Sequence, residues 1–255
     1  MNPYIGITDF TDFGQVQEMS QVFATHQPKG SSRVLHVGVM MSYKTLNSIP
    51  SKWQNAFPSK ERIASIFSSD EGYNCLHYAD YDNNPDLWKN IATAISFGGT
   101  DIHALQLDMI WPDPGEVAHG VHTSRKQIEV ILQIGKNALE EVNNDHQRVV
   151  ERLGDYEGVI HRVLLDKSMG KGLGMDANGL IPFAQAIKES FPTLGIGAAG
   201  GLGPETIQLV APLVTAFPDL SIDAQGRLRP SGNAIDPIDW SMAGNYLIKA
   251  QELFQ

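Results

Sequence analysis

The sequence predicts an α/β protein that folds as a (β/α)8 barrel. The chain has 255 residues, which is close to the usual size of such a barrel. Eight short apolar runs recur along it, and helical patterns lie between them. Because the runs are almost continuously apolar, both faces of each strand are expected to be buried, as in a parallel sheet covered by helices. We therefore expect residues 1–255 to form a single barrel domain, with a doubly wound open sheet as the alternative.

The eight apolar runs are the predicted strands. They are Tyr4–Ile7, Val34–Met41, Cys75–Tyr78, Ile102–Leu107, Val130–Ile134, Val159–Leu165, Leu194–Ala198 and Leu220–Ile222. Helices are predicted over residues 139–153 and 240–250, where the apolar side chains share one helix face. Three helices are expected to begin where a capping residue precedes a proline, at Pro85, Pro204 and Pro237.

The composition is typical of a globular protein with an acidic surface. Hydrophobic residues make up 42% of the chain, charged residues make up 19%, and the formal net charge is -10. An acidic surface repels phosphate backbones, so no nucleic-acid partner is expected. No apolar run approaches the roughly 18 residues of a membrane span, and the first residues lack a signal-peptide pattern, so we expect a cytoplasmic protein. The one cysteine, Cys75, is expected in the core, and the oligomeric state is left open.

Two glycine turns late in the chain are the first candidate for a binding site. Gly200 and Gly201 follow the seventh run, and Gln225 and Gly226 follow the eighth. Glycine lets the main chain approach a ligand closely, and a helix start after Gly201 would add free N–H groups and a positive dipole end. In these barrels the loops after strands 7 and 8 commonly hold phosphate, so we expect these four residues to bind it. A plain corner of the chain is the competing interpretation.

Carboxylates and lysines also follow the predicted strands. Asp166 closes the sixth run, where partial burial raises the pKa of a carboxyl group and suits it to donate a proton. A helix cap or a salt bridge is the alternative role for this residue. Asp9 and Asp108 follow the first and fourth runs and are the candidate bases. The further side chains that we expect to contact the substrate are Lys44, Gln106, Lys136 and Asp223.

The remaining motifs add little to the site. The eight histidines form no recognisable ligand spacing, so neither a metal nor another cofactor is expected. The glycine-rich stretch Gly170–Gly174 is expected to fold over a ligand. It lacks the spacing of a nucleotide-binding P-loop.

Several short segments fall in order at the ends of the predicted strands. They are Gly6-Ile7-Thr8, Gln106-Leu107-Asp108, Val163-Leu164-Leu165-Asp166, Met175-Asp176, Ala199-Gly200-Gly201-Leu202-Gly203-Pro204-Glu205 and Ile222-Asp223-Ala224-Gln225-Gly226. Together they resemble phosphoribosylanthranilate isomerase, a phosphate-binding (β/α)8 barrel of tryptophan biosynthesis. The resemblance spans nearly the whole chain, and it depends on the order of the segments more than on any one of them.

The resemblance implies an Amadori-type isomerisation of a phosphorylated aldose amine to a ketose amine. It implies that Asp166 is the general acid and that the glycine turns hold the phosphate. The family's basic cysteine corresponds to Ile5 here, its histidine corresponds to Asp108, and its arginine has Lys44 as the nearest counterpart. Isoleucine accepts no proton. We therefore interpret the chain as a divergent relative that keeps the phosphate site and the acid but acts on a different substrate.

Two other functions remain open. Ile5 favours a non-catalytic barrel that binds a phosphorylated metabolite. Lys136 or Lys167 favours an aldolase or epimerase that forms a Schiff base with its substrate. The expected partner is a small phosphorylated molecule.

Overall fold

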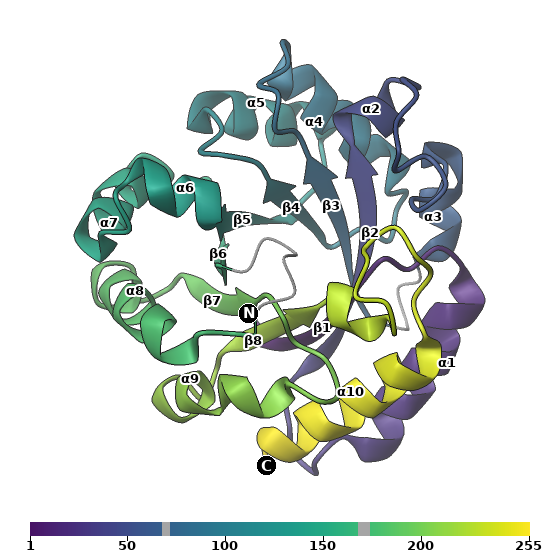
Figure 1. Ribbon diagram of the computed structural model, residues 1–255. Helices are drawn as coiled ribbons and strands as arrows, with labels where there is room; N and C mark the ends of the chain where they lie inside the picture. The colour runs from purple at the N-terminus through teal and green to yellow at the C-terminus, as the bar shows by residue number, and fades with distance from the viewer. Residues whose placement is uncertain (68–71, 168–173) are drawn as a thin grey trace.

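The computed structural model describes residues 1–67, 72–167 and 174–255. Within them, parallel strands close into a barrel in the order β1 to β8, and helices surround it (Figure 1). The strands are β1 (Tyr4–Thr8), β2 (Val34–Ser42), β3 (Tyr73–Ala79), β4 (Ala104–Asp108), β5 (Glu129–Gly135), β6 (Arg162–Asp166), β7 (Gly195–Ala199) and β8 (Ser221–Ala224). Each expected run corresponds to one strand, and β1 pairs with β8, so the predicted (β/α)8 barrel is confirmed.

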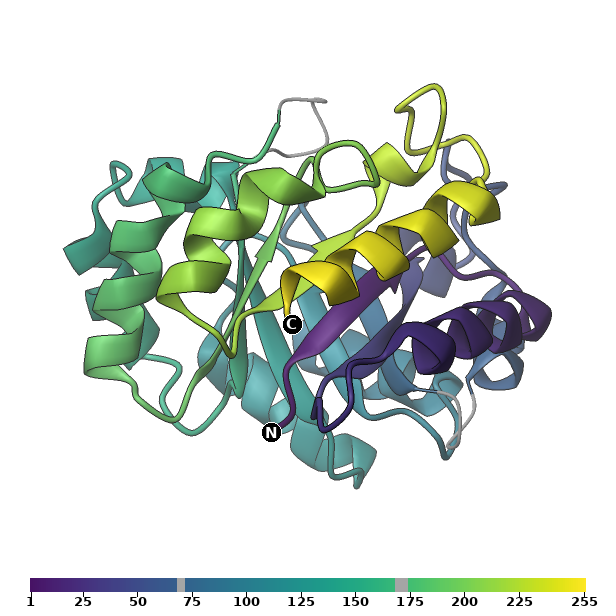
Figure 2. The same cartoon turned by 90° about the horizontal axis from the view of Figure 1, so that it is seen from below.

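The helices cover the outer surface of the barrel (Figure 2). The α-helices are α1 (Phe13–His26), α2 (Tyr43–Leu46), α3 (Ile63–Ile66), α4 (Leu87–Phe97), α5 (Pro114–Ser124), α6 (Lys136–Glu141), α7 (His146–Gly154), α8 (Ala177–Ser190), α9 (Ala211–Ala216) and α10 (Trp240–Leu253). The short 3-10 helices are η1 (Lys60–Arg62), η2 (Ile207–Val210) and η3 (Gly226–Leu228). The first and last helices, α1 and α10, lie side by side. Among the described helices, none has the length and apolar character that crossing a membrane requires.

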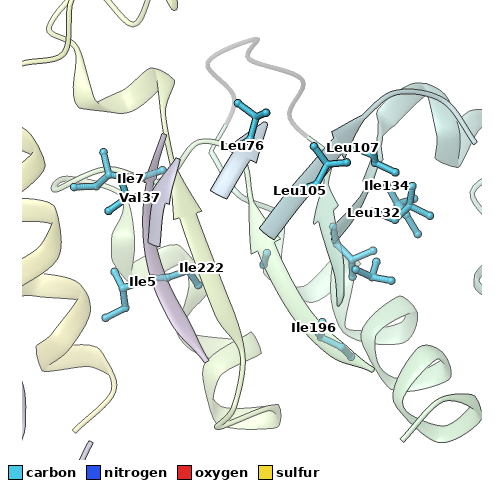
Figure 3. Packing of buried hydrophobic residues seen from close by; sticks show 14 of the residues in the cluster. Ile5, Ile7, Val37, Leu76, Leu105, Leu107, Leu132, Ile134, Ile196 and Ile222 are labelled. Carbon is cyan, nitrogen blue, oxygen red and sulfur yellow. The ribbon is translucent and has the colours of Figure 1, made fainter. Parts of the chain in front are cut away.

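Alternate side chains of each strand point into the barrel lumen or outward to the helices. On β1, Ile5 and Ile7 belong to the large apolar cluster between strands and helices (Figure 3), whereas Tyr4 belongs to a separate, smaller cluster. Buried polar side chains share the inward direction of Tyr4. They include Thr8, His36, His77, Gln106, Arg162 and Asp223. Barrels of this class are usually filled by bulky branched side chains, so this polar lumen indicates where a function is to be sought.

Bare main chain on β1 and β2 makes room for these polar groups. A Cβ atom at Gly6 would lie 2.6 Å from Oδ1 of Asp223 and 2.7 Å from Nδ1 of His36. A Cβ atom at Gly38 would lie 2.6 Å from Oγ1 of Thr8. These separations are shorter than van der Waals contact, so a larger residue at either position would displace a polar side chain of the lumen.

The predicted helix starts at the three prolines are wrong by two or three residues. α4 begins at Leu87, and α10 begins at Trp240 because the side chain of Asp239 caps it by accepting hydrogen bonds from two backbone N–H groups. Beyond Pro204 the chain first makes a turn, and helical structure begins at Ile207. In each case the proline belongs to the loop that leads into the helix.

The helix predicted over residues 139–153 is divided into α6 and α7. The break occurs at Asn143 and Asn144, whose φ angles are 56° and 53°. Asparagine tolerates this left-handed backbone because its short polar side chain forms local hydrogen bonds. The apolar periodicity across the break is real, and both helices pack against the barrel through it.

Candidate functional site

A hollow opens at the carboxyl ends of the strands. It is lined by Thr8, Met40, His77, Gln106, Asp108, Gln133, Leu164, Asp166, Ala199, Gly200, Gly201, Asp223, Gln225, Gly226, Arg227 and Gly232. Its enclosed volume is about 90 Å³, and the empty space reaches about 670 Å³ only when the region open to solvent is included. Both predicted glycine turns and three carboxylates therefore line the same hollow, as a phosphate-binding catalytic site would require.

The first glycine turn has a backbone that only glycine adopts readily. The φ angles of Gly200 and Gly201 are 101° and 70°, in the left-handed region that other residues avoid. Oγ1 of Thr206 donates a hydrogen bond to the carbonyl oxygen of Gly201 at 2.6 Å, which fixes the turn. Because helical structure begins only at Ile207, the contribution expected from a helix end is smaller than the sequence predicted. The main chain of the turn itself is what faces the hollow.

The second glycine turn brings a cation that the sequence reasoning missed. Gln225 and Gly226 line the hollow, and Arg227 follows them directly. The close approach of this segment to the first turn depends on Gly203, where a Cβ atom would lie 2.7 Å from the carbonyl oxygen of Arg227. A guanidinium group beside glycine-rich main chain is a suitable partner for a phosphate group. The sequence signal was an arginine next to a predicted phosphate turn.

The three carboxylates come from alternate strands. Burial raises the pKa of Asp108 to about 6; the hydroxyl of Tyr81 opposes this by donating a hydrogen bond, and the charge of Asp166 adds to it. Burial also raises the pKa of Asp223 to about 7, against a 2.8 Å hydrogen bond from the hydroxyl of Thr8. Two carboxyl groups that titrate near neutral pH are suited to general acid–base chemistry.

A row of polar side chains leads from Asp166 into the lumen. Nε2 of Gln133 lies 3.4 Å from Oδ2 of Asp166. Nε2 of Gln106 lies 2.9 Å from Oε1 of Gln133 and 3.2 Å from Nδ1 of His77. If the amide of Gln106 donates both bonds, Nδ1 of His77 is an acceptor and its proton is on Nε2. The expected contact of Gln106 with a ligand is therefore compatible with a second role, the orientation of His77.

The row continues from His77 to Asp223. Nε2 of His77 lies 3.2 Å from Nε2 of His36, and Nδ1 of His36 lies 3.8 Å from Oδ1 of Asp223. Burial lowers the pKa of His77 to about 3 and holds the pKa of His36 well below its usual value. Both imidazoles are thus neutral at physiological pH. One tautomer of each ring satisfies the hydrogen bonds from Asp166 to His36, whereas the 3.8 Å separation between His36 and Asp223 is too long for a hydrogen bond.

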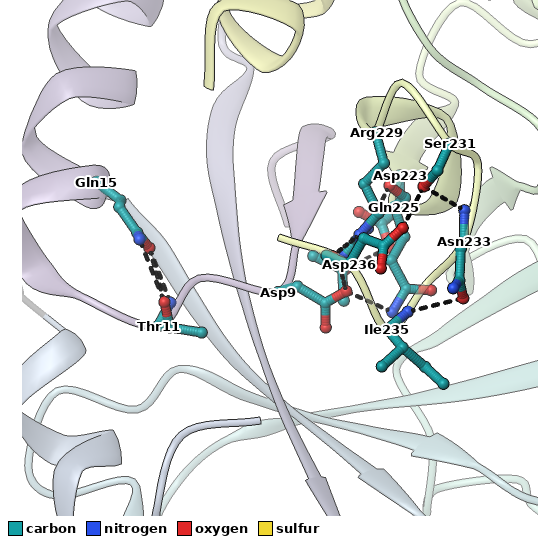
Figure 4. A network of polar contacts seen from close by, with 11 residues as sticks. Asp9, Thr11, Gln15, Asp223, Gln225, Arg229, Ser231, Asn233, Ile235 and Asp236 are labelled. Carbon is teal, nitrogen blue, oxygen red and sulfur yellow. Dashed lines mark hydrogen bonds and ion pairs between the residues drawn. The ribbon is translucent and has the colours of Figure 1, made fainter. Parts of the chain in front are cut away.

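Asp9 has a different environment from the other three aspartates. Its Oδ2 atom lies 2.6 Å from Nη2 of Arg229 and 3.0 Å from Nε2 of Gln225 (Figure 4). Arg229 also donates to the backbone carbonyls of Gln225 and Asp236. Asp9 is not part of the lining of the hollow. Its carboxylate supports the loop after β8, and this arrangement argues against the expected role as a base.

The lysines proposed as anion partners also lie away from the hollow. Nζ of Lys44 is 3.6 Å from Oδ2 of Asp82, and Nζ of Lys136 is 3.3 Å from Oε1 of Glu140. Both lysine side chains are more than two-fifths exposed, at 48% and 43%. Nζ of Lys167 donates to a carbonyl of α8. No lysine occurs among the described residues that line the hollow, which argues against a Schiff base there.

The structure places Ile5 but describes only the end of the stretch Gly170–Gly174. Ile5, at the family's cysteine position, points away from the lumen into the outer apolar cluster (Figure 3). The glycine-rich stretch Gly170–Gly174 lies outside the described residues except for Gly174. Among the described side chains, the carboxylates of the hollow are therefore the candidates to replace the family's cysteine as the base.

Comparison with known proteins supports the architecture. No family model matches the chain, and no curated protein matches it either. Solved structures do match: active domain 2 of a thermostable chitinase from Pyrococcus furiosus is 12% identical over 100% of this chain and 97% of that chain, with a TM-score of 0.59. The chain has the (β/α)8 barrel fold.

Two further matches are enzymes of other kinds. The carboxyl transferase domain of Rhizobium etli pyruvate carboxylase is 13% identical over 99% of this chain and 48% of that chain, with a TM-score of 0.56. Phosphonopyruvate hydrolase is 13% identical over 88% of this chain and 75% of that chain, with a TM-score of 0.50. At such low identity these matches show the fold alone, since this barrel hosts many unrelated reactions.

Proposed function

We propose that the protein is an enzyme that moves protons on a small phosphorylated sugar or sugar amine. One observation carries the proposal: glycine turns suited to phosphate and three buried or half-buried carboxylates line a single hollow at the carboxyl ends of the strands. One small substrate could then bind the glycine turns through its phosphate and exchange protons with the carboxylates. The order of motifs resembling phosphoribosylanthranilate isomerase supports the same class of substrate.

The phosphate group would bind at the two glycine turns. Gly200, Gly201 and Gly226 present main chain to the hollow without an intervening Cβ atom, and Arg227 supplies positive charge. The protein as a whole has a net charge of -10, so an anion needs such a local cation to approach the mouth. This part of the proposal is the common arrangement of barrels that bind phosphate after strands 7 and 8.

Asp166 and Asp108 would share the proton transfers. Asp166 would donate a proton to the ring oxygen of the sugar as the ring opens, and Asp108 would accept the proton from C2, the carbon next to the anomeric carbon. A pKa of about 6 makes Asp108 a stronger base than an ordinary aspartate while leaving it largely ionised at neutral pH. The charge of Asp166 contributes to that pKa, so a proton on either carboxyl favours the charged form of the other.

The proposal is tested by incubating the protein in D2O with phosphoribosyl anthranilate and with a panel of aldose phosphates. We expect NMR to show deuterium at the carbon next to the aldehyde or imine carbon of at least one compound. Asp166→Asn should lower turnover by a factor of about 100 or more and leave the Kd for inorganic phosphate within a factor of about two. Lys44→Met is the matched control, since its side chain lies outside the hollow, and it should behave as the native protein.

The outcomes separate the alternatives. Full turnover by Asp166→Asn would refute its role as the acid. Phosphosugar binding without turnover or deuterium exchange across the panel would favour the non-catalytic barrel. Failure to bind phosphate or any phosphosugar would contradict the whole proposal.

A further inference from the structure

Three side chains that commonly bind transition metals meet in the lumen of the barrel. They are His36 on β2 and Cys75 and His77 on β3, and all three are buried. Each offers a ligand atom, and the three atoms lie within 4.8 Å of one another. His77 also lines the hollow, so this cluster adjoins the proposed substrate site. The cluster is not visible in the linear sequence, because His36 and Cys75 lie 39 positions apart and only strand pairing brings them together.

The spacing of the ligand atoms is close to that of a tetrahedral zinc site. Zinc bonds of about 2.0–2.1 Å to nitrogen and 2.3 Å to sulfur place neighbouring ligand atoms about 3.3–3.7 Å apart. The Nε2 atoms of His36 and His77 are already 3.2 Å apart. Sγ of Cys75 lies within 4.8 Å of the histidine ligand atoms, so it would have to move toward them by at most about 1 Å to bind the same ion.

The surroundings orient each ligand from its far side. Zinc bound to Nε2 of His77 places the ring proton on Nδ1, so the amide of Gln106, whose nitrogen lies 3.2 Å from Nδ1, must turn its oxygen toward that proton. A carboxylate oxygen of Asp223 lies 3.8 Å from Nδ1 of His36. The backbone N–H of Gln106 donates a hydrogen bond to the sulfur of Cys75. Such outer partners fix the orientation of histidine and thiolate ligands in metal sites.

Among the described residues, two buried polar atoms at the cluster lack hydrogen-bond partners, which is consistent with a site that binds a cation. Within the described parts of the chain, Nδ1 of His36 and Oδ1 of Asp223 have no hydrogen-bond partner. A divalent cation held by one thiolate and two neutral imidazoles would leave one positive charge, which the Asp223 carboxylate is placed to balance. The close packing of the cluster depends on Gly38, since a Cβ atom there would lie 3.0 Å from Nε2 of His77.

We propose that His36, Cys75 and His77 bind one zinc ion, with the fourth coordination position open to the hollow. Imidazole and thiolate ligands favour zinc and disfavour magnesium or calcium, which prefer oxygen ligands. Three protein ligands with one open position is the arrangement of catalytic zinc sites. The proposal goes beyond the proposed function and does not depend on it, because it concerns metal binding in the absence of substrate.

Cobalt is the most direct probe of this site. The protein is produced in minimal medium supplemented with Co²⁺, so that the ion is present while the chain folds, and its metal content and absorption spectrum are measured. We expect one Co²⁺ per chain, visible d–d bands and a thiolate-to-cobalt charge-transfer band that added Zn²⁺ abolishes. The chain has one cysteine, so the charge-transfer band reports on Cys75 alone.

Matched variants make the result decisive. Cys75→Ala should remove the charge-transfer band, and His77→Gln should lower the cobalt content by a factor of about 10 or more. Circular dichroism checks that each variant is folded. The control is the double variant His119→Ala and His122→Ala, which removes two exposed histidines of α5 and should retain both the metal and the band.

Three results would overturn the proposal. The first is native protein without stoichiometric cobalt, and the second is a cobalt spectrum without the sulfur band. The third is loss of the metal from the α5 control together with its retention in Cys75→Ala, which would identify an adventitious surface site. Since no substrate is used, each of these results leaves the phosphate proposal standing.

Discussion

Nη2 of Arg229 lies 2.6 Å from Oδ2 of Asp9, and this buried ion pair joins the end of β1 to the segment that follows β8 (Figure 4). The side chains are 3% and 5% exposed. Because Arg229 also donates to the backbone carbonyl of Gln225, the pair holds the second glycine turn in place. Asp9, which the sequence marked as a candidate base, is thus linked through Arg229 to the second glycine turn.

Loss of one partner of this pair should destabilise the protein strongly. Arg229→Met leaves the Asp9 carboxylate buried without its cation, so we expect the free energy of unfolding to fall by about 3–5 kcal/mol. The double variant Asp9→Asn and Arg229→Met should lose less stability than its two single variants together. We expect its free energy of unfolding to be about 1–3 kcal/mol higher than their summed effects predict. Urea unfolding measures all three variants. Lys136→Met, which breaks an exposed pair, is the control and should change stability by less than about 1 kcal/mol. Additive single effects would show that Asp9 and Arg229 do not interact.

The backbone of the first glycine turn should be essential for phosphate binding. Gly201→Ala places a Cβ atom on a residue with a φ angle of 70°, so the turn must distort. We expect the Kd for inorganic phosphate, measured by calorimetry, to rise by a factor of about 10 or more. Gly30→Ala is a matched control, because Gly30 has a φ angle of 84° but lies in the loop before β2. It should lose comparable stability and keep the native Kd; equal effects of both variants on the Kd would argue against the turn.

The raised pKa of Asp108 should appear in the pH dependence of stability. The folded protein keeps this proton up to about pH 6, whereas an unfolded aspartate releases it near its ordinary pKa of 3.8. The stabilisation from the protonated carboxyl is therefore complete below about pH 4 and is lost as the pH rises through about 6. The Asp108→Asn variant lacks this loss. Its free energy of unfolding relative to that of the native protein should therefore rise by about 2 kcal/mol between pH 4 and pH 7.

Tyr81→Phe tests the same carboxyl in the opposite direction. It removes the hydroxyl that donates a hydrogen bond to Asp108, and this bond lowers the pKa. The pH range over which the native chain loses stability should therefore move upward in the variant. Thermal unfolding from pH 4 to pH 8 follows both variants. A stability difference between Asp108→Asn and native protein that is constant across this range would mean that the pKa is not raised.

The glycine of β1 should be intolerant of a methyl group. Gly6→Ala would bring a Cβ atom within 2.7 Å of both Asp223 and His36, so we expect a loss of about 1–3 kcal/mol in the free energy of unfolding. Gly154→Ala, near the end of α7, meets no atom within 4 Å and should be neutral or stabilising by up to about 1 kcal/mol. Equal stability of the two variants would show that the lumen accommodates the extra carbon.

The strands and the glycine turns were predictable because their signals are local. An apolar run bounded by polar residues indicates a buried strand, and a pair of glycines at its end indicates a turn. Gly200 and Gly226 lie 26 positions apart in the sequence, yet their convergence at one hollow follows from adjacent strands of a closed barrel. The same logic correctly placed Asp108 and Asp166 at the mouth.

The sequence is least informative where the direction of a side chain or the pairing of strands decides what lies in the hollow. Asp9 and Lys44 follow strands as the rule requires, but their side chains turn toward Arg229 and Asp82 instead of the hollow. The polar row of the lumen depends on which alternate residue points inward and on the register between strands. His77 meets a residue 41 positions away through that register, and neither position is unusual in the linear sequence.

The bare positions of the lumen have an evolutionary consequence. Space at Gly6 is occupied by the side chains of Asp223 and His36, and space at Gly38 is occupied by Thr8 and His77. A larger residue at either glycine is tolerated only if a partner shrinks or withdraws. In an alignment of related barrels, each glycine and its polar neighbours should therefore be exchanged together, and such paired changes would mark lineages in which the chemistry of the lumen has altered.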